Sequence, residues 1–232
     1  MPTLDRHGEI YRLDLGDDEN RFHPDWIGAV GSALEEVSAA TGPRALVTTG
    51  SGKFFSNGLD LDWLGAHRDQ IDDYVAQVHG LLAKVLVLPV PNVVAVQGHA
   101  FAGGAMFALA HDFRVMRADR GFFCLPEVDI GIAFTPGMSE LIRARLSPQV
   151  AHEAMTTGRR YGGIEAQAAG IVDRTATVEA VVATATEWAS TLTGKAGPTL
   201  GTIKQRMYAR ALAALRQPAT LDRPGGDSNR DR

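Results

Sequence analysis

The sequence is poor in the features that mark several classes of protein. Its 232 residues include one cysteine, Cys124, which excludes an intrachain disulfide and a cysteine-rich metal site. The formal net charge is -4 and no basic block precedes the last few residues, so nucleic acid and anionic membranes are poor candidate partners. Apolar stretches are broken well short of a membrane span, and the first residues lack the basic-then-apolar pattern of a secretory signal. We therefore expect a soluble, cytoplasmic protein.

The composition that remains is that of a globular enzyme-sized domain. Hydrophobic residues make up 45% of the chain and charged residues 22%, which suits one domain with a large core. Strand patterns alternate with helix patterns in the first part, and helix patterns dominate after about residue 136. This order predicts an α/β fold with a helical C-terminal subdomain.

The individual elements follow from apolar spacing and from the positions of proline and glycine. Alternating or continuous apolar runs predict strands at residues 9–15, 45–49, 93–96, 113–116 and 121–124. Apolar residues at helical spacing predict helices at residues 24–40, 69–88, 103–110, 136–145, 148–157, 178–192 and 198–215. Residues 50–61 are expected to form a loop, and residues 217–232 are too polar and too rich in proline and glycine to order themselves.

Two places in this pattern offer backbone N–H groups that a ligand can use. Gly103 and Gly104 begin a buried helix, where the first amides lack internal partners and lie at the positive end of the helix dipole. In the loop before it, Gly58 places the amide of Leu59 in a turn. Two N–H donors aimed at one point form an oxyanion hole, and glycine lets a ligand approach the backbone. One acidic residue, Glu127, follows the last predicted strand directly.

Three stretches of the sequence resemble a known family. FFSNGLDL at residues 54–61, GHAFAGGAMFALAHD at 98–112 and FCLPEVDIG at 123–131 are similar to the crotonase superfamily, the enoyl-CoA hydratase/isomerase family. Their order and spacing agree over roughly residues 8–215. The resemblance implies a crotonase-type spiral of ββα turns in residues 1–196 and a C-terminal helix at 197–216 used in trimer contacts, the helical part beginning as early as about residue 136. It also implies acyl-CoA thioester substrates, CoA as part of the substrate, no metal or separate cofactor, and a homotrimer or hexamer.

The resemblance also implies roles for individual residues. The amides of Leu59 and Gly103 would hold the thioester oxygen, and Glu127 would be the catalytic carboxylate. The expected substrate contacts are Phe55, Asn57, Gly58, Leu61, Phe101, Gly104, Met106 and Phe134. An apolar wall that includes Met106, Phe101 and Phe134 would desolvate Glu127 and raise its pKa. Basic side chains such as Lys53 or Lys204 would contact the CoA part of the substrate.

One departure from the family pattern indicates the reaction. Hydratases of the family carry a second glutamate on the helix after the double glycine, and here that position is Met106. A single glutamate favours a proton shuttle, which is Δ3,Δ2-enoyl-CoA isomerisation. Dienoyl-CoA isomerases carry an acid eight residues beyond the glutamate, where this chain has Thr135. Two alternatives stay open: an enoyl-CoA hydratase that manages with one carboxylate or recruits Asp129, and a homologue that binds acyl-CoA without catalysis.

Overall fold

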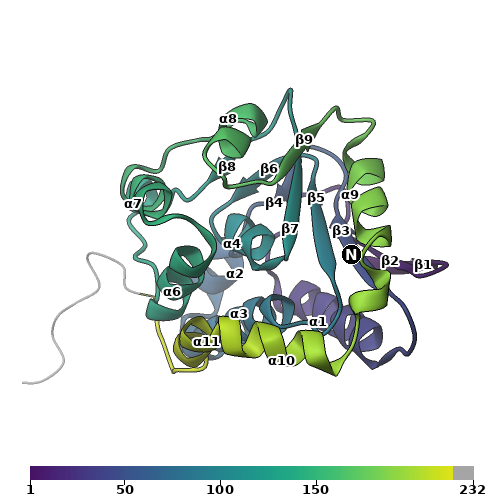
Figure 1. The fold of residues 1–232 in the computed structure, drawn as a ribbon. Helices are drawn as coiled ribbons and strands as arrows, with labels where there is room; N and C mark the ends of the chain where they lie inside the picture. The colour runs from purple at the N-terminus through teal and green to yellow at the C-terminus, as the bar shows by residue number, and fades with distance from the viewer. Residues whose placement is uncertain (222–232) are drawn as a thin grey trace, which may run out of the picture.

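The computed structural model describes residues 1–221 and contains two β-sheets surrounded by helices (Figure 1). The larger sheet has six strands in the order β1-β2-β3-β5-β7-β9. Their bounds are β1 (Thr3–His7), β2 (Ile10–Asp14), β3 (Ala45–Thr49), β5 (Asn92–Val96), β7 (Phe113–Arg117) and β9 (Arg174–Ala176). The β1–β2 pair is antiparallel and every later pair is parallel.

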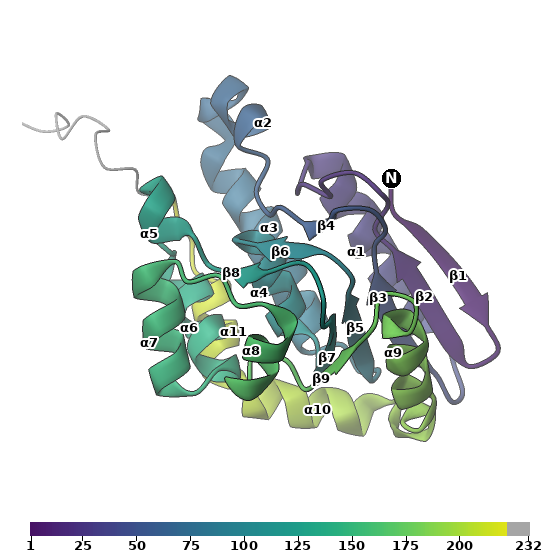
Figure 2. The same cartoon turned by 90° about the horizontal axis from the view of Figure 1, so that it is seen from above.

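The smaller sheet has three parallel strands in the order β4-β6-β8, which are β4 (Phe54–Ser56), β6 (His99–Phe101) and β8 (Phe123–Cys124). Each turn of the chain supplies a strand to the large sheet, then a strand to the small sheet, then a helix. The helices that follow the small-sheet strands in the three turns are α2 (Leu61–Ala66), α4 (Gly103–Ala110) and α5 (Glu127–Ile130). Figure 2 shows α5 and α2 to the left of and above the small sheet. The predicted spiral of ββα turns is confirmed.

Two groups of helices cover the two faces of the large sheet. Alternate strand residues such as Leu46, Val94 and Met116 face the main core, which they share with α1 (Pro24–Ala39), α3 (Ile71–Leu86) and α4. The intervening residues, such as Val47 and Val93, pack against α9 (Val181–Ser190) on the other face. Both faces of these parallel strands are therefore buried, which explains why the predicted strand at 93–96 is an unbroken run of apolar residues.

The remaining helices lie at the C-terminal end of the chain, as predicted. They are α6 (Pro136–Arg145), α7 (Pro148–Thr157), α8 (Gly163–Ala168), α10 (Pro198–Met207) and α11 (Ala209–Leu215). A short 3-10 turn at Thr193–Lys195 precedes α10, and another at Arg68–Gln70 lies between α2 and α3. Proline stands at the first turn of α1, α6, α7 and α10, and Ser147 and Thr135 cap two of them through their side chains. In the part of the chain that the structure describes, no helix has the length and apolar character needed to cross a bilayer.

The prediction of one amphipathic helix over residues 198–215 is wrong. The helix is interrupted at Tyr208, so the apolar residues predicted to share one face lie on two separate helices. Ala211 is buried in α11, whereas Ile203 and Met207 of α10 are 50% and 65% exposed. On α10 it is Lys204 that points inward, and its ammonium group donates to the carbonyl oxygens of residues 88 and 90.

Other departures involve short elements that leave little pattern in a sequence. Strands β1, β6 and β9 and helices α2, α5 and α8 are not among the predicted elements, and β4 lies within residues 50–61, which were expected to form a loop. Val178 was expected in the stripe of α9, but the helix begins at Val181 and Val178 is exposed. Of the tail predicted to be disordered, Leu221 packs partly buried against the main core, and residues 222–232 lie outside the described residues.

The buried ion pair of Lys204 gives a stability prediction. Its ammonium nitrogen lies 2.7 Å from a carboxylate oxygen of Asp112, and both side chains are largely buried. Lys204→Ala removes the cation paired with that carboxylate, which keeps its hydrogen bond from the Asn92 N–H, and removes the donor to two carbonyl groups. We therefore expect the free energy of unfolding to fall by about 3 kcal/mol in urea titrations. The exposed Lys195 is the matched control, and Lys195→Ala should change it by less than about 0.5 kcal/mol. Equal unfolding midpoints for the two variants would contradict this role.

Candidate active site

The small sheet brings the three motif stretches to one place. Its strands are parallel, so the residues that follow β4, β6 and β8 meet at the same edge. Crevices outside the carboxyl ends of parallel strands are the usual place for ligand binding. Here a cleft of about 410 Å³ opens, and its lining residues are Arg21, Asn57, Leu59, Leu61, Asp62, Phe101, Ala102, Cys124, Pro126, Glu127, Ile130, Ile132 and Arg160.

Glycine allows two backbone segments to approach closely beside the cleft. Gly58 has φ of +78°, and a methyl group built on it would lie 2.6 Å from the amide nitrogen of Gly103. A methyl group on Gly104 would collide with the carbonyl oxygen of Ser56. Ala102, just before the helix, has φ of +49°, a conformation that is costly for a residue with a side chain. The structure thus packs the start of α4 directly against the loop after β4.

This packing places the two predicted N–H donors side by side. A methyl group built on Gly103 would lie 3.5 Å from the amide nitrogen of Leu59. Among residues 1–221, neither the Leu59 nor the Gly103 N–H donates to a protein acceptor. Gly103 is the first residue of α4, so its amide also lies at the positive end of that helix. The pair can therefore donate to one oxygen atom of a ligand in the cleft.

Glu127 is the buried acid of the cleft. It is the first residue of α5, its residue exposure is 5%, and its Oε2 has no hydrogen-bond partner among the described residues. Burial raises the pKa of Glu127 from an ordinary 4.5 to about 8, an effect only partly offset by a hydrogen bond from its own backbone N–H. Asp62 also lines the cleft, but it is exposed and pairs with Arg21. A carboxyl group with such a pKa can take up and release a proton near neutral pH.

The predicted substrate contacts fall into two sets, those that lie at the cleft and those that do not. Asn57, Leu61 and Phe101 line the cleft, and the three glycines Gly58, Gly103 and Gly104 are buried beside it. Three predicted contacts do not line it, namely Phe55, Met106 and Phe134. Phe55 stacks on Phe107 at 6.2 Å, Met106 lies in the main core, and Phe134 packs against that core.

Of the three residues predicted to form an apolar wall around Glu127, Phe101 lines the cleft, whereas Met106 and Phe134 do not. The cleft takes further apolar lining from Ile130 and Ile132, which follow Glu127 in the chain. Helix α5 has only four residues, too few for a sequence pattern to indicate this. Met106 is enclosed because every residue of α4 is buried, so its side chain packs among core residues.

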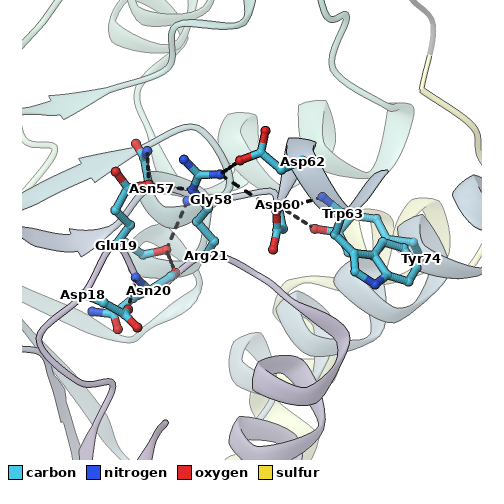
Figure 3. Close-up of polar contacts among 11 residues, drawn as sticks. Asp18, Glu19, Asn20, Arg21, Asn57, Gly58, Asp60, Asp62, Trp63 and Tyr74 are labelled. Atoms are coloured by element: carbon cyan, nitrogen blue, oxygen red, sulfur yellow. Dashed lines mark hydrogen bonds and ion pairs between the residues drawn. The ribbon is translucent and has the colours of Figure 1, made fainter. Parts of the chain in front are cut away.

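Sequence reasoning also missed Arg21, which comes from the polar turn after β2. Its guanidinium group lies 2.5 Å from carboxylate oxygens of both Glu19 and Asp62 (Figure 3). Asp60, at 3.9 Å, is a third carboxylate near it and also caps α2 by accepting from the Trp63 N–H. Asp60 and Asp62 thus hold this loop in place. Three carboxylates, those of Glu19, Asp60 and Asp62, therefore lie near the single guanidinium group of Arg21, and the net charge of this group of side chains is negative.

A cluster of cations and aromatic rings lies at the other side of the cleft. The ring of His99 has Phe54, Phe101 and Phe122 within 5.6 Å, centroid to centroid. Burial and the charges of Lys53, Arg120 and Arg160 hold the pKa of His99 below its ordinary value. In residues 1–221, none of these three cations has a carboxylate within 4 Å. We call these three cations and the four rings the cationic cluster, and Arg160 connects it to the cleft.

Other polar residues near the cleft have structural partners. The thiol of Cys124 donates to the carbonyl oxygen of Gly158 at 3.2 Å, and burial raises its pKa to about 11. Asp129 is exposed, lies against Gly158 and does not line the cleft. Lys204, predicted as a CoA contact, is buried in the ion pair with Asp112, so that prediction is wrong. Among the described residues, no three acidic, histidine or cysteine side chains are grouped to hold a metal ion.

The sequence matches the model of one family over most of its length. Residues 9–224 match Enoyl-CoA hydratase/isomerase. Enoyl-CoA delta isomerase 3 of Arabidopsis thaliana is 41% identical over 220 residues, which cover 90% of this chain and 92% of that protein. Enoyl-CoA delta isomerase 2, peroxisomal, of the same plant is 38% identical, with 90% of this chain and 92% of that protein covered.

Solved structures of similar proteins share the fold. A protein from Mycobacterium tuberculosis described as a probable enoyl-CoA hydratase superposes with a TM-score of 0.82 at 29% identity, covering 93% of this chain and 91% of that one. An apo structure from the same organism, described as an enoyl-CoA isomerase, gives a TM-score of 0.81 at 29% identity, covering 93% and 94%. An enoyl-CoA hydratase/isomerase family protein from Pseudomonas syringae gives 0.85 at 26% identity, covering 92% and 94%.

The pKa of Glu127 predicts how stability depends on pH. Between its ordinary pKa of 4.5 and the folded value of about 8, the folded protein keeps a proton that the unfolded chain has released. The free energy of unfolding therefore falls as pH rises through this range, by up to on the order of 4 kcal/mol. Glu127→Gln should remove this dependence and be more stable than the wild type above about pH 8. Urea titrations of both proteins across this range measure it, and parallel pH profiles would contradict the assigned pKa.

Proposed function

We propose that this chain, which belongs to the enoyl-CoA hydratase/isomerase family, is a Δ3,Δ2-enoyl-CoA isomerase. The observation that carries the proposal is the single buried carboxyl group of the cleft. Within residues 1–221, Oε2 of Glu127 has no hydrogen-bond partner, the pKa of the carboxyl group is raised, and the N–H groups of Leu59 and Gly103 at the cleft have no protein acceptor. The delta-isomerase relatives, each aligned over about nine-tenths of both chains, support the same reaction.

The proposed reaction is a proton shuttle along the acyl chain. The Glu127 carboxylate removes a proton from C2 of a 3-enoyl thioester, and the electron pair moves onto the thioester oxygen to give a dienolate. The same group then returns the proton at C4, so the double bond moves from C3–C4 to C2–C3 and no atom is gained or lost. Leu59 and Gly103 donate to the oxygen as its charge grows, and each donor contributes on the order of 3 kcal/mol to the transition state.

Hydration is less well supported by the same geometry. Adding water across a double bond is commonly credited to two carboxylates that position one water molecule. Here Met106 occupies the position of the second acid and lies in the core, while Asp129 does not line the cleft. A proton shuttle calls for no redox cofactor and no metal, and CoA enters as part of the substrate.

We assign the phosphate groups of CoA to the cationic cluster. Lys53 and Arg160 lie over the rings of Phe54 and Phe101 at 5.0 and 5.7 Å. Cations without carboxylate partners beside flat aromatic faces suit a nucleotide with several phosphates. Arg21, at the opposite side of the cleft, is already neutralised by acidic neighbours and suits phosphate less well.

Assembly and location extend the proposal beyond the single chain. We propose that copies associate through the C-terminal helices, because Ile203 and Met207 of α10 present exposed apolar side chains. A trimer or hexamer and a cytoplasmic location stay predictions from the sequence.

The decisive assay follows the position of the double bond. Purified protein given a 3-enoyl-CoA should form the conjugated 2-enoyl-CoA, seen as a rise in ultraviolet absorbance. Glu127→Gln should lower kcat by at least about 100-fold, since the shuttle loses its base. The exposed Glu187 on α9 is the matched control, and Glu187→Gln should keep full activity. A fully active Glu127→Gln variant would disprove the shuttle.

The same preparation separates the two alternatives. Rapid conversion of 2-enoyl-CoA to 3-hydroxyacyl-CoA, lost in Asp129→Asn, would show a hydratase. Binding of acyl-CoA with turnover of neither thioester would show a protein that only binds its ligand.

The cationic cluster predicts a separate effect on substrate affinity. Lys53→Gln and Arg160→Gln should each raise KM for the acyl-CoA roughly tenfold at low salt, with a much smaller change in kcat, because each removes one charged contact to phosphate. The exposed Arg206 of α10 serves as the control, and Arg206→Gln should leave KM unchanged. A KM that is the same in all variants would place the phosphates elsewhere.

A further inference from the structure

In the loop after β4, residues 57–60, every backbone N–H group except one donates a hydrogen bond to a protein acceptor. The N–H of Asn57 donates to the carbonyl oxygen of Glu19 at 2.9 Å, and the N–H of Gly58 donates to Ser56 Oγ at 3.2 Å. The N–H of Asp60 donates to the hydroxyl oxygen of Tyr74 at 2.9 Å. Among the four amides of residues 57–60, the Leu59 N–H alone has no acceptor within the described chain.

The partners on either side of Leu59 fix the direction of its N–H. A peptide unit is planar, and its C=O and N–H point in opposite directions when it is trans. The Gly58 carbonyl accepts from the Phe22 N–H at 2.8 Å, so the Leu59 N–H of the same unit points the other way. The next unit contains the Asp60 N–H, and the Tyr74 hydroxyl holds it. Both peptide units that flank the Leu59 α-carbon are therefore anchored.

Tyr74 is a rigid anchor. It lies on α3, is fully buried, and its ring stacks on that of Trp63 with centroids 5.3 Å apart (Figure 3). Burial holds the pKa of its hydroxyl above the usual range, so the group stays neutral. Tyr74 does not line the cleft. Its influence on a bound thioester can only pass through Asp60 and the Leu59 amide.

We propose that Tyr74 is a positioning residue for the oxyanion hole, acting with Ser56 to aim the Leu59 N–H at the thioester oxygen. The proposal rests on the proposed function, since that function gives the Leu59 amide its role. Main-chain groups of Phe22 and Glu19 share the task, and Tyr74 and Ser56 are the two side chains that do so. Tyr74 thereby links helix α3 to the reacting carbonyl group.

The test removes one hydroxyl group and reads carbonyl polarisation directly. Tyr74→Phe keeps the buried ring and releases the Asp60 N–H. We expect kcat for 3-enoyl-CoA to fall roughly tenfold with KM changed less than about twofold, because the donor acts mainly in the transition state. A bound, conjugated dienoyl-CoA should show a smaller red shift of its absorbance than with the wild type. Ser56→Ala should change both readouts in the same direction.

The matched control is Tyr208→Phe. The hydroxyl oxygen of that tyrosine is partly buried and accepts from the Arg145 guanidinium group, but Tyr208 lies between α10 and α11 and does not line the cleft. Tyr208→Phe should lower the unfolding midpoint and leave kcat and the red shift unchanged. Reading the red shift at saturating ligand restricts the comparison to folded protein.

The possible outcomes distinguish failure of the positioning role from failure of the proposed isomerase function. A full red shift and full kcat in Tyr74→Phe would overturn the positioning role while leaving the isomerase intact. A wild-type chain that shifts the dienoyl spectrum but does not isomerise would end the isomerase, and a reduced shift in Tyr74→Phe would still support the positioning role. A wild-type chain with no red shift would overturn both.

Discussion

The structure depends on the contact between two stretches of main chain, the loop at Gly58 and the start of α4 at Gly103. Side chains at these positions would hold the stretches apart, and glycine lets their backbones touch. Everything functional follows from that contact. It aligns the short strands β4 and β6, it brings two free amides together, and it leaves the following turn of the chain to deliver Glu127 beside them.

Two buried cations away from the cleft are paired with acids. Arg114 donates to the carbonyl of Ile171 and lies 3.2 Å from Asp173, and Lys204 meets Asp112. At the cleft, among residues 1–221, Oε2 of Glu127 and the amides of Leu59 and Gly103 have no protein partners. Buried side-chain atoms without partners also occur elsewhere in these residues, on Arg12, Asn20, Trp26, His79 and His99. The convergence of one carboxyl group and two amides, and not the lack of partners alone, is therefore what indicates a site whose partners arrive with the substrate.

The elements that the sequence predicts well are those with strong local signals. Proline and a capping side chain mark the starts of α6 and α7, and the apolar run of β5 marks a strand buried on both faces. Only β8 of the small sheet falls within a predicted strand, because β4 and β6, with three residues each, carry no periodicity. The pairing of these strands is decided by tertiary contact. The direction in which Met106 points could not be predicted either, because every residue of α4 is buried.

The site residues divide along the same line. The amides of Leu59 and Gly103 and the carboxyl of Glu127 lie in motifs that can be read from the chain. Arg21 and Tyr74 lie in a polar turn and an ordinary helix stripe, and only the fold places them near the loop after β4. The break between α10 and α11 could not be predicted either. It accompanies the burial of the Lys204 ammonium group against the carbonyl oxygens of residues 88 and 90, a contact between segments far apart in the sequence.

The interleaved topology has a consequence for how the protein comes into being. Parallel strands β4, β6 and β8 belong to successive turns of the spiral, so each pairing joins segments separated by a complete turn. Contacts between segments so distant in the chain close large loops and form slowly. The catalytic cleft therefore cannot exist on a nascent or half-wound chain. It arises only once the third turn has docked, which makes enzymatic activity a reporter of complete folding.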